Sequence, residues 1–186
     1  MGGPGVFPPQ PDGCMDLGQH RKTWKASNGE DRFRRAAYTY RWRNTPHPAL
    51  KVFDAPDGLA ACTRRLRSNT PLQALTLMND PAFVELAVGL ARRLMAEADS
   101  AANRIRLGFQ LCLGREPDAD ELRLLIDLVE SQRTEFTVQS AEAKAVVAKA
   151  KLLGQAPQKA GGDTELAAWS MAARVLLNLD ETITRE

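Results

Sequence analysis

The chain has 186 residues and a net charge of +2, and its 44% hydrophobic and 26% charged content is ordinary for a globular protein with its own core. No apolar run approaches the ~20 residues of a membrane span, and no CxxC or CxxCH run occurs, which argues against a transmembrane segment, a standard zinc site and covalent haem attachment in this chain. The charge is uneven, because residues 1–70 hold 12 basic and 6 acidic side chains whereas residues 71–186 hold 13 and 17; we interpret this as two halves that attract each other, with an anion-binding arm as the alternative.

Residues 1–58 are predicted to be an irregular, basic, Gly/Pro-rich N-terminal arm with a short helix. The glycines and prolines of residues 1–19 favour extended backbone. A helix is predicted over residues 30–43 because apolar side chains recur there at helical spacing, although residues 38–42 have strand propensity. Two prolines end this helix, and residues 44–58 are predicted to be a loop with a turn at its end.

Residues 59–186 are predicted to be an α-helical domain, because capping signals and apolar periodicity recur along them. Thr70 precedes a proline at the first helical position and Gln73 completes a capping box; Asp80-Pro81 marks a second helix start. A third helix over residues 100–113 is predicted to end at Gly114, and Asp118 opens another with a capping box.

The remaining helices are predicted over residues 140–153 and 164–179, with a flexible break at residues 155–162. The first of these is weakly amphipathic and is expected to project from the domain as a solvated arm or a partner-contact surface. The fold class is therefore mainly α: an irregular bundle of about five to six helices with an extended arm.

Apolar periodicity predicts which side chains face the core. On the helix that starts at Pro81, Glu85, Arg92 and Arg93 are expected on the opposite, polar face. The side chains expected to point inward are Phe83, Leu86, Ala87, Leu90, Leu94, Ile105, Phe109, Cys112, Leu113, Leu122, Leu125, Ile126, Val129, Leu166, Trp169, Ala173, Leu176 and Leu177. The three cysteines, Cys14, Cys62 and Cys112, allow one disulfide whose pairing stays open, as does the oligomeric state.

Five blocks carry a family resemblance: RFRRAAYTYRWRNTPHPAL (32–50), VFDAPDG (52–58), CTRRLRSNTPLQALTLMNDPAFVELA (62–87), LGREPDADEL (113–122) and AAWSMAARVLLNLDETITRE (167–186). Together they resemble the C-terminal domain of planctomycete-type exported proteins, domain of unknown function family 1553. The resemblance implies an upstream companion domain of unknown function and often, in addition, a planctomycete-type cytochrome c domain with haem c. It also implies a periplasmic or cell-surface location. It implies no cofactor and no catalytic residue in this chain.

The family resemblance also predicts that the chain is a C-terminal fragment, because Met1 matches an internal point of the family domain. The DNA upstream of Met1 tests this prediction. A reading frame that continues into a signal peptide supports a fragment, whereas a stop codon makes the short chain a genuine, cytoplasmic product.

The candidate site lies in and next to residues 53–80, which are called the signature here. It consists of His47, Asp54, Asp57, Arg64, Arg65, Arg67 and Asn69. Arginines before a helix start can hold an anionic group. They can also pair with Asp54, Asp57 and the acidic half of the chain, which is the interpretation we favour, or grip an upstream domain.

Other chemistries are weaker alternatives. A metal site from His47, Asp54, Asp57 and Cys62 matches no standard spacing. Haem ligation by His20 or His47 and nucleophilic catalysis have less support still. Basic and aromatic residues interleave over residues 24–42, but packing explains them better than nucleic-acid binding.

The sequence therefore favours a non-catalytic structural or interaction module of an exported multidomain protein. The alternative is part of an envelope enzyme or redox protein that binds an anionic, glycan-like ligand through Arg64, Arg65, Arg67 and Asn69. Whether the chain is an enzyme stays open, with a preference for none.

Overall fold

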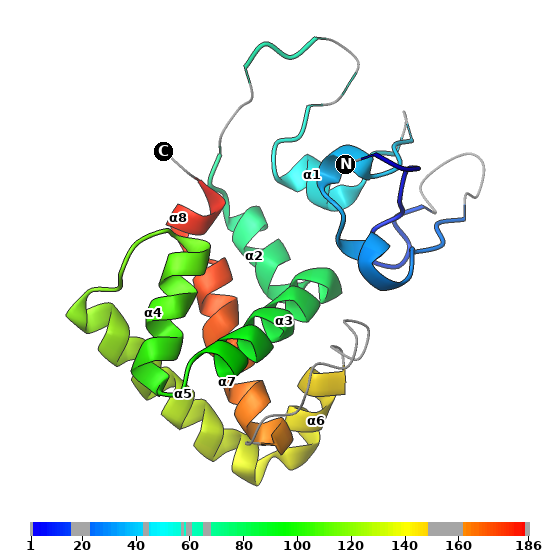
Figure 1. Cartoon of the computed structure of the whole chain (residues 1–186). Helices are drawn as coiled ribbons and strands as arrows, with labels where there is room; N and C mark the ends of the chain where they lie inside the picture. Colours follow the sequence, from blue (N-terminus) through cyan, green and yellow to red (C-terminus); the bar gives the residue numbers. More distant parts are fainter. Residues whose placement is uncertain are drawn as a thin grey trace. The chain divides into compact units, whose positions relative to one another are not determined.

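A computed structural model describes residues 2–15, 23–42, 45–56, 58, 61–64, 68–148 and 162–184 (Figure 1). These residues contain eight α-helices and two 3-10 helices, with isolated bridges in place of strands, which confirms the mainly α prediction. Eight exceeds the expected five to six because α1 and α8 are helices of only 5 and 4 residues.

The chain divides into two compact units, Met1–Ala82 and Phe83–Glu186, which are called unit 1 and unit 2 below. The predicted boundary after Gly58 stays a prediction, since Leu59 lies outside the described residues. The predicted break at residues 155–162 falls outside them too, except for its last residue.

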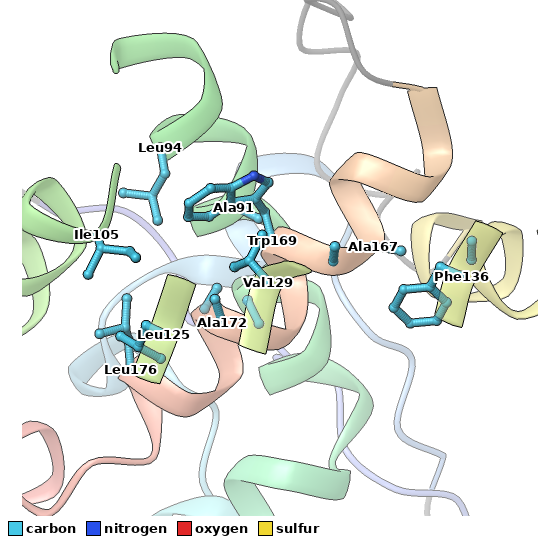
Figure 2. Packing of buried hydrophobic residues seen from close by; sticks show 14 of the residues in the cluster. Ala91, Leu94, Ile105, Leu125, Val129, Phe136, Ala167, Trp169, Ala172 and Leu176 are labelled. Atoms are coloured by element: carbon cyan, nitrogen blue, oxygen red, sulfur yellow. The ribbon is translucent and has the colours of Figure 1, made fainter. Parts of the chain in front are cut away.

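Unit 2 is a bundle in which α7 makes contacts with α4, α5, α6 and α8. Its helices are α3 (Pro81–Glu97), α4 (Ala101–Cys112), α5 (Ala119–Val138), α6 (Ser140–Ala148), α7 (Gly162–Leu177) and α8 (Asp180–Ile183). Trp169 on α7 is fully buried, and Leu94, Ile105, Val129 and Leu176 belong to the same apolar cluster (Figure 2). Burying each such aliphatic side chain stabilises the fold by roughly 1.5–3 kcal/mol.

The predicted start and end of α4 and the predicted start of α5 are confirmed, whereas α7 spans Gly162–Leu177 and not the predicted residues 164–179. Ser100 accepts a hydrogen bond from Asn103 N at 3.2 Å and begins α4. The Asp118 capping box begins α5. Gly114, with φ +76°, follows α4 and donates to Phe109 O and Gln110 O, as a C-terminal cap does.

One prediction for unit 2 is wrong in part and another is wrong. On α3, Ala87 and Leu94 are buried as predicted, but Glu85, predicted on the polar face, is 2% exposed, and Leu86, predicted to point inward, is 39% exposed. Residues 82–91 are apolar nearly all round, so periodicity alone does not orient this helix. The second error concerns α6, which packs on α7 and buries Ala143 instead of projecting as a solvated arm.

Unit 1 is built from short pieces: the 3-10 helices Gly29–Phe33 and Ala36–Tyr38, then α1 (Pro48–Val52) and α2 (Pro71–Asn79). The predicted helix over residues 30–43 is wrong. Its second half pairs with the extended backbone at Val6 instead: Val6 N donates to Tyr38 O, and Tyr40 N donates to Val6 O. Strand propensity in residues 38–42 therefore prevails over helical spacing once a partner segment is present. The loop predicted for residues 44–58 contains α1, with Pro48 at its first turn.

The described helices include no single one that is long and apolar enough to span a membrane. The pair α2 and α3, interrupted at Asp80, passes the same test of length and composition only when the two helices are taken together.

Candidate functional site

The centre of the signature is a polar latch formed by Asp54, Ser68 and Gln73. Ser68 donates to Asp54 Oδ2 twice, from its backbone N at 3.0 Å and from its Oγ at 2.5 Å. Gln73 is 1% exposed, and its Nε2 donates to Ser68 Oγ at 3.0 Å and to Val52 O at 2.9 Å. The latch joins two points that are 14 residues apart in the chain.

The backbone conformation at Asp54 and the capping box at Thr70 position the side chains that form the latch. Asp54 has φ +55°, a left-handed conformation that aspartate tolerates better than most residues. Thr70 and Gln73 form the predicted capping box, with Thr70 N donating to Gln73 Oε1 at 2.9 Å. Gln73 therefore uses its carbonyl oxygen to begin α2 and its amide group to hold the latch.

Residues 55–67, called the arginine loop here, connect Asp54 and Ser68 of the latch in the sequence. Arg64 is exposed, and so are Cys62 and Asn69 nearby. Cys62 Sγ donates to Arg64 O at 3.4 Å. Asp57, Arg65 and Arg67 belong to this loop by sequence, but they lie outside the described residues. Loops whose ends are held close together are frequently functional sites.

His47 has partners other than those of the latch. It is 6% exposed, its ring lies 5.7 Å from that of Trp24, and its Nε2–H donates to Pro9 O at 3.0 Å. Burial lowers the pKa of His47 below its ordinary 6.5, while the bond to Pro9 and the charge of Asp80 act in the opposite direction. The imidazole is therefore neutral at pH 7, and its hydrogen bond holds the extended segment around Pro9.

The part of the chain that the structure describes contains no cluster of side chains suited to bind a metal ion. No group of three or more His, Cys, Asp or Glu side chains there could hold an ion. Asp54 is engaged with Ser68, and Cys62 is exposed on the loop. The ligand or domain-contact role of the seven candidate residues stays a prediction.

Sequence reasoning missed Ser68 and the second role of Gln73. Their partners are Asp54 and Val52, which precede them by 14 and 21 residues. The only local signal was the serine before the capping box, and serine is common in any loop. The aromatic contacts of Phe7 in the arm were also missed.

Unit 2 uses its charges for structure. Glu165 accepts from Arg133 Nε at 2.7 Å and from Trp169 Nε1 at 2.8 Å, and these bonds lower the pKa of Glu165. Arg115 pairs with Glu121 and Glu181 at 2.7 and 2.8 Å, which raises the pKa of Arg115 and lowers those of both carboxyl groups. These side chains therefore already have charged partners within the unit.

The latch and the arginine loop lie in a part of the chain that a family model matches. The model described as PSD1, protein of unknown function (DUF1553), matches residues 1–129. The chain belongs to this family. The match contains all of unit 1, with its latch and arginine loop, and extends into α5. The resemblance of the block at residues 167–186 stays a prediction, since the match ends before it. No curated protein and no solved structure matches the chain.

Proposed function

We propose that this chain is a non-catalytic interaction module of an exported multidomain protein, and that the arginine loop with α2 contacts another domain of that protein. One observation carries the proposal: Asp54 is hydrogen-bonded by Ser68. Asp54, the acidic residue nearest to Arg64 in sequence among those that the structure describes, therefore has its partner in Ser68, while Arg64 is exposed. This arrangement favours the domain-contact interpretation over self-pairing with Asp54.

The helix that follows the loop adds an apolar surface. Leu72, Leu75 and Met78 of α2 are 59%, 55% and 44% exposed and recur every three residues, so they share one side of the helix. Interfaces commonly combine an apolar centre with a charged rim that fixes orientation. The complementary partner is a protein surface with an apolar centre and acidic side chains at its edge.

We propose, from the resemblance to exported proteins, that this module acts in the periplasm or at the cell surface. We assign any haem c of the parent protein to an upstream domain, because the chain has no CxxCH run. A stop codon directly upstream of Met1 would contradict this setting and put the chain in the cytoplasm.

Hydrogen exchange tests the contact. Amide exchange in residues 71–79 is compared between this chain and the protein encoded by the longer reading frame, and we expect slower exchange in the longer protein. Leu75→Ser should abolish the difference by placing a hydroxyl in the apolar contact. Leu124→Ser makes the same change at a side chain of α5 that is 62% exposed, and it should leave the difference intact.

A sulfated oligosaccharide of the heparin type tests the alternative function, an anionic glycan-like ligand. Binding of this oligosaccharide is measured by calorimetry. The alternative is favoured if the double variant Arg64→Ala with Arg67→Ala abolishes binding, the control Arg106→Ala with Arg123→Ala preserves it, and α2 shows no added protection from exchange in the longer protein. Unchanged exchange in α2 of the longer protein contradicts the proposed domain contact in either case.

A further inference from the structure

A short extended segment of the N-terminal arm, residues 6–9, is bound through its backbone by the rest of unit 1. Val6 N donates to Tyr38 O at 2.8 Å, and Val6 O accepts from Tyr40 N at 2.7 Å. Phe7 N donates to Ser27 Oγ at 2.9 Å, and Phe7 O accepts from Ser27 N at 2.8 Å. Both residues thus have their amide and carbonyl groups paired with residues at least 20 positions away.

The two prolines that follow are bound in the same way, through side chains with ring N–H donors. Trp24 Nε1 donates to Pro8 O at 2.7 Å, and His47 Nε2 donates to Pro9 O at 3.0 Å. Prolines have no amide hydrogen, so every backbone polar group of residues 6–9 has a partner. The indole and imidazole rings lie 5.7 Å apart, next to each other along the segment.

Aromatic contacts hold the one large side chain of the segment. The Phe7 ring is stacked on Tyr40 with ring centres 4.9 Å apart, and it meets Trp24 edge-on at 5.1 Å. Val6 is the segment's only fully buried side chain, at 3% exposure. A hydrophobic anchor, an aromatic residue and two prolines are therefore recognised by a surface of aromatic rings with N–H donors.

The segment's own sequence keeps it extended. Proline holds its φ near −65° and restricts the residue before it to extended conformations, so residues 7–11 (FPPQP) resist helix formation. Peptides of this kind lose little conformational entropy on binding, which is why aromatic grooves recognise them widely. The recognition uses only groups that any polypeptide with this pattern would present.

We propose that Trp24, Ser27, Tyr38, Tyr40 and His47 form a peptide-binding surface for extended segments in which an aromatic residue precedes two prolines, called the groove below, and that residues 6–9 occupy it intramolecularly. The partner is a segment of this class presented by another polypeptide, which displaces the chain's own segment. The groove involves neither the latch nor the arginine loop, so its test is independent of the proposed domain contact.

The experiment uses the full chain with Phe7→Ala and a fluorescein-labelled peptide of residues 2–11, GGPGVFPPQP. Loss of the Phe7 ring weakens the intramolecular competitor, whereas the peptide supplies the ring again. We expect fluorescence anisotropy to show binding about tenfold tighter, or more, than to the unmodified chain, which corresponds to roughly 1.4 kcal/mol. A peptide with alanine in place of Phe7, Pro8 and Pro9 should not bind.

Two further variants of the Phe7→Ala chain separate groove recognition from general adhesion. Trp24→Phe keeps a ring but removes the donor to Pro8 O, and it should weaken binding of the labelled peptide about tenfold. Trp42→Phe is the matched control, because the ring of Trp42 meets Tyr40 edge-on at 5.4 Å, and it should leave the affinity unchanged. Equal weakening by both variants would overturn the proposal.

The unmodified chain provides a readout that does not depend on the folding of Phe7→Ala. An attached segment acts at an effective concentration of about millimolar, so the free peptide must be added at comparable or higher concentration. We expect the indole N–H resonance of Trp24 to shift with added peptide and to stay fixed with the alanine-substituted peptide. A resonance that does not respond to either peptide overturns the proposal, as does an equal response to both.

Discussion

Unit 2 and unit 1 are stabilised in different ways. Unit 2 has a continuous apolar cluster with Trp169, Phe109 and Leu94 fully buried. In the described part of unit 1, only Val6 and Met15 are buried hydrophobic residues. There, side chains bond to distant backbone carbonyls and rings stack on rings.

The difference follows from the backbone. A helix satisfies its own amide and carbonyl groups, so its side chains are left to pack. The irregular backbone of unit 1 needs partners, and polar side chains supply them. Arg34 illustrates this: it donates to Gly2 O and, at 3.0 Å, to Pro4 O, while its guanidinium lies 3.8 Å from the Tyr38 ring centre. Arg34 of the basic arm therefore has a structural role.

The largest expected effect is in the core of unit 2. Trp169→Ala removes a side chain with 0% exposure and leaves Glu165 without its indole donor, so we expect a loss of about 3–5 kcal/mol in the free energy of unfolding. Urea unfolding followed by circular dichroism measures it. Trp24 and Trp42 then remain as the only tryptophans, so their fluorescence reports on unit 1. Val138→Ala, at a side chain 83% exposed, is the control and should change little.

A smaller but more local loss is expected at the latch. Asp54→Ala leaves the amide and hydroxyl of Ser68 without their acceptor and should cost unit 1 about 1–3 kcal/mol. Faster tryptic cleavage at Arg64 measures the opening of the arginine loop. Asp54→Asn, which keeps the tolerance for a positive φ, should cost less. Equal cleavage rates in all three proteins would mean that the latch does not hold the loop.

As the pH falls, unit 1 should lose stability before unit 2. The folded pKa of His47 lies below 6.5, so its stabilising contribution is complete above pH 6.5 and is lost as the pH falls from there through the folded pKa. The pKa of Glu165 is held below its ordinary 4.5, mainly by Arg133, so its contribution persists until the pH falls below about 4.5.

Hydrogen exchange between pH 7.5 and 5 measures this order of acid unfolding. Unit 1 should lose protection first, and His47→Gln should remove that dependence on pH. Simultaneous loss in both units, or a pH profile unchanged by His47→Gln, would contradict the assignment.

The smallest effect is expected at an exposed ion pair of unit 2. Glu181 is 56% exposed and shares Arg115 with Glu121, so Glu181→Gln should lower the free energy of unfolding only slightly, and high salt should reduce the loss further. Glu121→Gln should cost more, because Glu121 also accepts from Asp118 N at the start of α5. Urea unfolding at low and high salt measures both, and the reverse order would be inconsistent with these contacts.

For the candidate site, the sequence predicted the capping box at Thr70 and Gln73 but not the long-range hydrogen bonds of Asp54, Ser68 and Gln73. The Thr70–Gln73 capping box is a contact between residues three apart, so it is visible in the sequence. The bond from Gln73 to Val52 O connects residues 21 apart, and no local pattern encodes it. Asp54 was assigned to arginines because opposite charges attract, whereas its described partners are the hydroxyl and amide of Ser68.

The sequence by itself determined where α4 begins and ends and where α5 begins, because caps such as Ser100, Gly114 and Asp118 act on backbone groups within one turn. Only the tertiary structure decided the burial of Glu85 on α3, the pairing of Val6 with residues 38–40, and the closure of the arginine loop at Ser68. The physical reason is sequence separation. Local contacts are set by neighbouring side chains, whereas these depend on which distant segment supplies the missing hydrogen-bond partner or apolar surface.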